Sequence, residues 1–138
     1  MITEDNIKMA IVEQLKGLEY KVYATEIKEG FKKPCCFVSV YPHDVEKQCS
    51  GMELVTDQVE IQYIPSIETT EECAQNAQKL RKEFCYQPIK VKDRRLTIET
   101  AHFEIEDYVL YMTFSLSYYQ QINEIQENET MEKLEFTM

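Results

Sequence analysis

The chain has 138 residues, 43% of them hydrophobic, and a formal net charge of −10. This length and composition fit a single globular domain with a core of its own, and they exclude an intrinsically disordered chain. The excess of acidic residues excludes a protein that holds nucleic acid or an anionic membrane surface through basic patches.

The N-terminus and the cysteines indicate a protein that is made and kept in the cytoplasm, or in a particle assembled there. The first residues, MITEDNIKMAIVEQL, carry acids where a secretion signal needs positive charge. No window of the sequence has the apolar length of a membrane span. The five cysteines are an odd number in a chain without a secretion signal, which argues against a disulfide framework.

The first elements expected in chain order are a helix and a short strand. Apolar residues recur at helical spacing over residues 3–18, and Thr3 is placed to cap the start of that helix. Residues 21–27 favour a short strand, because they include Val22 and Tyr23.

Two strands separated by a long loop are expected next. Cys36 to Tyr41 carries apolar side chains on both faces, which predicts an interior strand that Pro42 ends. Residues 43–52 are polar and predict a loop. Residues 53–64 alternate between apolar and polar, which predicts a strand with one buried and one wet face. Loops of such length are often functional.

A capping box predicts the start of a second helix. Thr69 and Glu72 have the spacing at which each side chain can cap the other residue's backbone. The residues that follow form an apolar stripe at helical spacing: Cys73, Ala77, Leu80 and Phe84. The helix is therefore expected to end near residue 84.

The next segment predicts a tight hairpin and then an irregularity. Residues 89–98 favour two short strands joined by a turn at residues 92–94. The apolar alternation changes phase between Ile98 and Ala101, which predicts a bulge or bend near Thr100.

The final ordered element expected is a long strand. A turn at residues 106–108 precedes residues 109–119, in which the even-numbered positions are apolar and the odd-numbered ones mostly polar. In this order the elements predict an α+β fold, in which two helices pack on a mostly antiparallel sheet.

Residues 120–138 differ in composition, so we divide the chain into a domain over 1–119 and an acidic C-terminal tail over 120–138. The tail carries five Glu and one Lys and cannot bury much surface by itself. Two interpretations stay open, a frayed terminus and an extended arm that docks on another subunit. In the second, the subunit contacts are the apolar residues at its end: Met131, Leu134 and Phe136.

The cysteines and histidines give little support to a metal site or a nucleophile. Residues of the types that bind zinc gather near the first long strand: Cys35, Cys36, His43 and Cys49. Adjacent strand residues point to opposite faces, however, so the cysteine pair cannot turn toward one ion. A nucleophilic cysteine needs His43 or His102 within hydrogen-bond reach, and neither local sequence is typical of a nucleophile turn. Buried cysteines that pack as small apolar groups are the alternative.

Four segments, taken together, resemble a known family. They are EIKEGFKKPCCFVSVYP (Glu26–Pro42), VEIQYIP (Val59–Pro65), LTIETAHFEIEDYVLYMTFSLSYY (Leu96–Tyr119) and MEKLEF (Met131–Phe136). Their order and character are similar to the tail terminator family of contractile-tailed phages and prophages of Firmicutes, over nearly the whole chain. One departure is the turn before the last strand, where the family usually has Asp-Gly and this chain has Asp107-Tyr108.

The resemblance implies a structural protein without enzyme activity or cofactor. It implies a ring, commonly of six copies, that caps the head-proximal end of the tail tube, stops tube polymerisation and presents a surface to the neck. The implied partners are further copies of the chain, the tube protein, and sheath and neck or connector proteins, while DNA passes through without specific binding. The implied location is the tail–neck junction of a virion or of a tailocin, a headless contractile particle.

The acidic charge fits a channel along which DNA slides, because a negative wall repels phosphates. Either the wet strand face bearing Glu60 or the loop over 43–52 would line such a bore or face a neighbouring subunit. Alternatives to a terminator are another neck or tail-completion protein, a small cytoplasmic binding module, and a cysteine-dependent enzyme.

Overall fold

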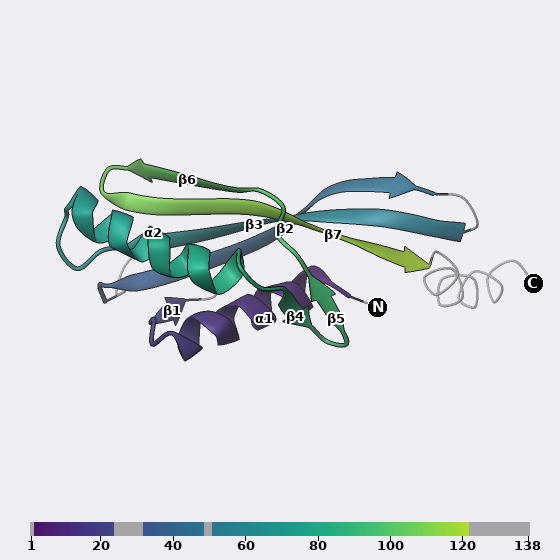
Figure 1. Cartoon of the computed structure of the whole chain (residues 1–138), viewed down its shortest axis with the longest axis horizontal. Helices are drawn as coiled ribbons and strands as arrows, with labels where there is room; N and C mark the ends of the chain where they lie inside the picture. Colours follow the sequence, from purple (N-terminus) through teal and green to yellow (C-terminus); the bar gives the residue numbers. More distant parts are fainter. Residues whose placement is uncertain (1, 24–31, 49–50, 122–138) are drawn as a thin grey trace, which may run out of the picture.

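The computed structural model describes residues 2–23, 32–48 and 51–121, and it confirms the α+β fold. A five-stranded sheet carries two helices and a small two-stranded sheet on one face (Figure 1). The elements are α1 (Glu4–Gly17), β1 (Val22–Tyr23), β2 (Cys35–Lys47), β3 (Met52–Ile64), α2 (Thr70–Phe84), β4 (Ile89–Val91), β5 (Arg94–Leu96), β6 (Ala101–Glu106) and β7 (Val109–Gln121).

The large sheet has the strand order β1-β2-β3-β7-β6. Among the described strands only the β1–β2 pair is parallel, so the sheet is mostly antiparallel, as the sequence predicts. The first predicted strand covered residues 21–27, and its last part, residues 24–27, lies outside the described residues. Among the described residues, no helix is both long and apolar enough to cross a lipid bilayer.

Both helices begin at the predicted caps. The Thr3 side chain accepts a hydrogen bond from the Asn6 backbone, and the Asn6 side chain accepts one from the Thr3 backbone. Thr69 caps α2 by accepting from the Glu72 backbone. The reciprocal half of that predicted capping box is absent, because the Glu72 carboxylate binds Ser66 instead. Each helix is therefore started by its threonine, as expected.

The hydrophobic core lies between the helices and one face of the sheet. The buried positions alternate along β3 and β7 as predicted, from Val55 to Tyr63 and from Leu110 to Tyr118. The α2 side chain Phe84 stacks on Phe114 of β7, with ring centroids 6.3 Å apart. The burial of these apolar side chains holds the helices on the sheet, because each Å² of apolar area removed from water contributes about 25 cal/mol.

The predicted loop over 43–52 is wrong. β2 runs through Pro42 to Lys47 and pairs with β3 as far as Glu53, with a shift of register between Pro42 and Asp44. β1 pairs with β2 only as far as Phe37, so no described strand pairs with the outer edge of β2 at Pro42, which lies beside a bulge. A proline is tolerated there because its missing N–H removes no ladder bond.

The predicted bulge or bend near Thr100 is a bend at Glu99, where the chain passes from the small sheet to the large one. β5 ends at Leu96, earlier than expected, and β6 starts at Ala101 in the large sheet. The β4–β5 turn is also shorter than predicted, because Arg94 belongs to β5. The phase slip therefore marks the residues that carry the chain from one sheet to the other.

Candidate functional site

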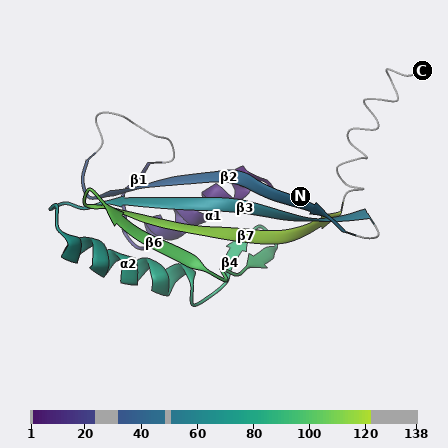
Figure 2. The same ribbon diagram turned by 90° about the horizontal axis from the view of Figure 1, so that it is seen from above.

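The face of the large sheet opposite the helices is polar along β3 and β7, and no described helix covers it (Figure 2). At the β2 end of the same face, Phe37 is buried and stacks on Tyr23. Hydroxyl and amide side chains form rows across β3 and β7. Thr56 Oγ1 lies 2.9 Å from Ser117 Oγ, and Ser115 Oγ donates to Gln58 Oε1 over 2.9 Å. These cross-strand pairs satisfy the side chains within the sheet and leave a flat, half-buried surface.

One end of this open face is strongly acidic. The register places Glu60 of β3 and Glu104 of β6 on the same face as Tyr111 of β7. Burial raises the pKa of Tyr111, and the carboxylates of Glu106, Glu60, Asp107 and Glu104 raise it further. The response of one tyrosine to four acids indicates a negative potential over this end of the sheet.

The β2–β3 hairpin extends beyond the helical layer (Figure 1). Every residue of β2 from Tyr41 to Lys47 is exposed, and Tyr41 and Val45 are among the exposed large hydrophobic residues. Beyond Phe37 the outer edge of β2 has no paired strand within the described part of the chain. An extended hairpin with apolar side chains and an open edge is suited to contact with another protein.

Two buried hydrogen bonds and one exposed hydrogen bond hold the base of this hairpin against the domain. Tyr118 donates a hydrogen bond to Asp57, and the backbone of Ile2 donates one to Gln120 over 3.1 Å. Arg94 of β5 donates to the backbone carbonyl of Tyr119. These hydrogen bonds tie the N-terminus and the small sheet to the distal half of β7.

The cysteine pair belongs to the interior. The side chains of Cys35 and Cys36 are fully buried, and burial, together with the neighbouring Cys35, raises the pKa of Cys36 to about 12. The thiol is therefore protonated at neutral pH and a poor nucleophile or metal ligand. His43 is exposed on the hairpin and His102 is exposed on β6, whereas Cys49 lies outside the described residues.

Within residues 2–23, 32–48 and 51–121, no group of three or more His, Cys, Asp or Glu side chains is placed to hold a metal ion. The predicted subunit contacts Met131, Leu134 and Phe136 lie outside the described residues. β7 extends to Gln121, slightly past the domain boundary expected after residue 119.

A family model described as "Phage tail terminator protein" matches residues 6–131. The chain belongs to this family. Membership gives it a structural role in a phage-type tail, and the match takes in the sheet, both helices and the first of the predicted contact residues, Met131.

A solved structure has a similar fold. It is a chain of the "Virion of native gene transfer agent (GTA) particle", with a TM-score of 0.54 and 14% sequence identity, over 80% of this chain and 90% of that one. A search of curated proteins found no match.

Proposed function

We propose that this tail terminator assembles as a ring, of six copies, on the head-proximal end of a tail tube. The ring ends tube polymerisation and joins the tail to the neck, in a phage or tailocin particle assembled in the bacterial cytoplasm. The observation that carries the proposal is a sheet with two unlike faces, one covered by helices and the other open, polar and acidic.

The open face is suited to line the bore of the ring. Its central rows are hydroxyl and amide groups that are already paired with one another, so they offer DNA few strong hydrogen-bonding sites. The carboxylates of Glu60 and Glu104 add a potential that repels phosphates. A wall of this kind lets DNA pass without holding it.

The projecting hairpin is suited to the axial contacts of the ring. It carries exposed Tyr41 and Val45 beyond the layer that the helices form, so it reaches a partner that the body does not touch. The tube end or a neck protein would occupy this position. Termination then follows from shape, because one side of the ring fits the tube while the other offers the next tube subunit no matching surface.

The experiment that tests this proposal is electron microscopy of the purified protein mixed with purified tail tubes. The expected images have a ring at one end of each tube, with a symmetry that averaging can count. A protein that binds neck complexes but ignores tube ends would instead be another neck or tail-completion component. A protein that binds neither would be better described as a small binding module.

A second experiment concerns the predicted arm. A chain that ends after Gln121 keeps all of β7 and its Gln120–Ile2 bond, and it removes Met131, Leu134 and Phe136. We expect the shortened protein to fold with the same thermal stability and to form rings less readily. Rings of unchanged stability would show that the tail is a frayed terminus.

A further inference from the structure

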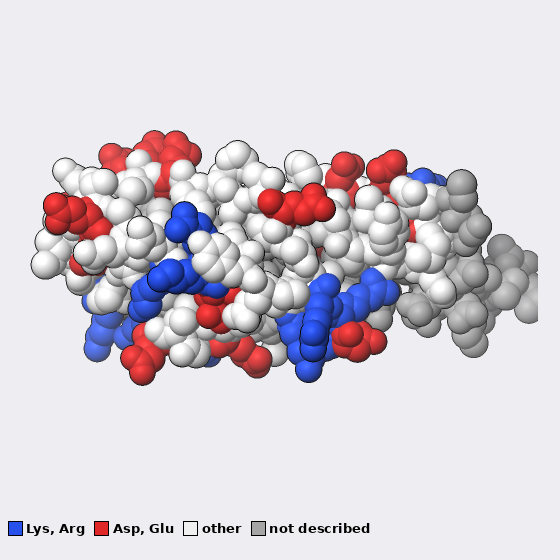
Figure 3. Space-filling model, viewed as in Figure 1, with Lys and Arg blue, Asp and Glu red and all other residues white. Residues whose placement is uncertain are grey.

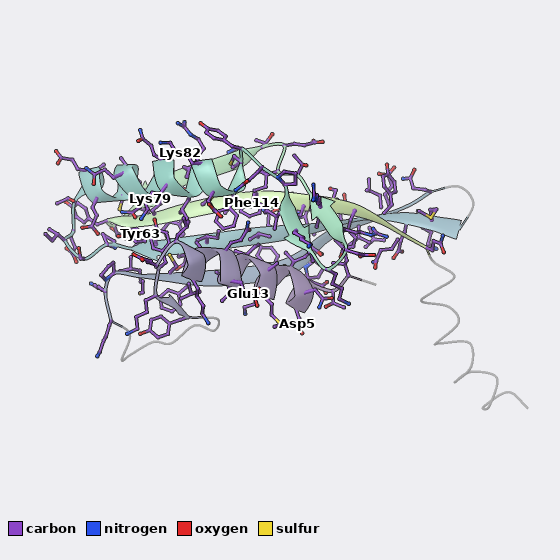
Figure 4. The ribbon with its side chains drawn as sticks, turned by 60° about the horizontal axis from the view of Figure 1, so that its bottom comes forward. Asp5, Glu13, Tyr63, Lys79, Lys82 and Phe114 are labelled. Carbon is purple, nitrogen blue, oxygen red and sulfur yellow. The ribbon has the colours of Figure 1, made fainter. Side chains whose placement is uncertain are left out.

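A groove runs between α1 and β4 on the helical side of the domain. Its volume is about 450 Å³, and its lining includes Met9, Ala10 and Glu13 from α1, Lys90 from β4 and Lys92 from the β4–β5 turn. Met9 is 62% exposed, because it lies on the side of the helix away from the buried Ile7 and Ile11. Figure 4 shows α1, with Glu13 labelled, next to the small sheet. The groove therefore offers an apolar contact within a charged rim.

One wall of this groove is formed by β4. β4 pairs with β5 alone among the described strands, and α1 packs against its other edge (Figure 1). The helix therefore covers that edge, and the groove offers a partner the side chains of α1 and β4 instead of backbone groups.

The small sheet is basic although the chain as a whole is acidic. Residues 89–96 carry four basic side chains, Lys90, Lys92, Arg94 and Arg95, against the single acid Asp93. The basic side chains gather over this sheet on the face shown in Figure 3. Lys90 is exposed at the rim of the groove. An acidic peptide would therefore be attracted to this position.

The C-terminal segment of the chain has the complementary composition. Residues 122–138 carry five Glu and one Lys, and over residues 133–136 the apolar Leu134 and Phe136 alternate with Lys133 and Glu135. Alternation of this kind favours an extended segment with one apolar side. Such a segment matches the groove in charge and in the apolar contact at Met9.

We propose that residues 131–136 of one copy dock as an extended segment in the α1–β4 groove of a neighbouring copy. The proposal rests on the ring assembly proposed above and names the surface that receives the arm. Contacts between Met9 and the apolar residues of the arm, and between Lys90 and its glutamates, hold the docked segment.

The direction of β7 favours a neighbouring copy over the same chain. β7 runs past α1 and β4 and ends beyond them in both side views (Figures 1 and 4). Residues 120–138 contain neither Gly nor Pro, the residues that most favour a sharp reversal. The seventeen residues after Gln121 can extend by up to about 60 Å, which is enough to reach an adjacent subunit.

The test is photo-cross-linking in the full-length protein. Met9 is replaced by p-benzoylphenylalanine, and labelled and unlabelled copies are mixed before rings form on tail tubes. Cross-linked peptides are then identified by mass spectrometry. The matched control carries the same photoreactive residue at Ile67, which is exposed to a similar extent, 66% against 62%, in the β3–α2 connection.

The expected result is a cross-link from position 9 to residues 131–136 of a differently labelled copy, and none from position 67. Rings without this cross-link, or with cross-links only inside one copy, would overturn the docking proposal and leave the ring proposal intact. Absence of rings would overturn both, and electron microscopy of the same sample distinguishes the two cases.

Charge reversal gives a second readout. Lys90→Glu should reduce the cross-link yield about fivefold or more, because a like charge then faces the acidic arm. The control Lys82→Glu makes the same change in net charge on exposed α2 and should leave the yield unchanged. Glu132→Lys together with Glu135→Lys should restore the yield in the Lys90→Glu protein. Equal yields in all variants would contradict the charge contact.

Discussion

Tyr118 on β7 donates a hydrogen bond to Asp57 on β3, with 2.9 Å between the hydroxyl and Oδ2, inside the core at the base of the hairpin. Asp57 is fully buried, and its second oxygen, Oδ1, has no hydrogen-bond partner. Burial raises the pKa of Asp57, the Tyr118 hydrogen bond partly offsets this, and nearby Glu4 raises it further. The hydrogen bond fixes the hairpin to the body, and the free energy needed to bury Asp57 depends on whether its carboxyl group is protonated.

Asp57→Asn should therefore increase stability more at neutral than at acidic pH. The raised pKa means that the folded state binds the proton more tightly than the unfolded state does, so the wild-type chain loses stability as the pH rises from 3.8 through the folded-state pKa. Asn carries no charge and escapes this loss. Thermal unfolding of both proteins at pH 4 and pH 7.5 measures it, and a pH-independent difference would refute the argument.

Tyr118→Phe should destabilise the protein by about 1–3 kcal/mol, because it leaves a second buried Asp57 oxygen without a partner. Tyr119→Phe is the matched control, since Tyr119 follows it on the same strand and is 53% exposed. Urea unfolding compares the two. Equal midpoints would indicate that the buried hydrogen bond contributes nothing.

Glu72→Ala should lower the free energy of unfolding by about 1–2 kcal/mol, because it loosens the connection between β3 and α2. The partial exposure of the carboxylate limits this loss. Glu72 accepts hydrogen bonds from Tyr63, from Ser66 and from the Ile67 backbone. Burial alone would raise the pKa of Glu72, but these bonds outweigh it and lower the pKa. This stability is present above the ordinary pKa of 4.5 and is lost as the pH falls through the folded-state value.

Urea unfolding at pH 7 and at pH 3 measures the effect of Glu72→Ala. The control is the adjacent, exposed Glu71→Ala, which removes the same charge from the first turn of α2. A loss that is no larger than the control's, or that persists undiminished at pH 3, would contradict the role given to the Glu72 hydrogen bonds.

Tyr108→Gly should stabilise the β6–β7 hairpin by about 0.5–1 kcal/mol. Asp107 and Tyr108 have φ angles of 51° and 61°, the left-handed values of a two-residue hairpin turn. Glycine adopts them without strain, although it adds entropy to the unfolded chain. Tyr108→Ala separates the effect of losing the ring from the effect of relieving the backbone strain, because it removes the ring and keeps the strain. A glycine variant no more stable than the alanine variant in thermal unfolding would refute the argument.

The parts of the fold that follow from local pattern could be predicted from the sequence. β3 and β7 each bury alternate residues, and the Cys73–Leu80–Phe84 stripe places α2 on the sheet. Asp57 also occupies a buried position of the β3 alternation, between Val55 and Val59, so the pattern contained a signal for the hydrogen bond at the base of the hairpin. The polarity of the residue concealed it.

The features that depend on neighbours in space could not be predicted. A proline ends a strand in the centre of a sheet but is tolerated in an edge strand. Pro42 lies at an edge because β1, the neighbour of β2, pairs with it only at Cys36 and Phe37 in the described part of the chain. The groove between α1 and β4 likewise follows from the position of the small sheet, which is separate from the large one and lies beside α1. The predicted contacts Met131, Leu134 and Phe136 stay a prediction.

Seeded extension of tail tubes tests the central claim most directly. Purified tubes are incubated with this protein, unbound protein is removed, tube subunits are added, and tube lengths are measured by electron microscopy. If the protein works as a shape-complementary cap, capped ends stop growing while untreated tubes lengthen. Tubes that bear the protein at their ends and still lengthen at the untreated rate would contradict the account.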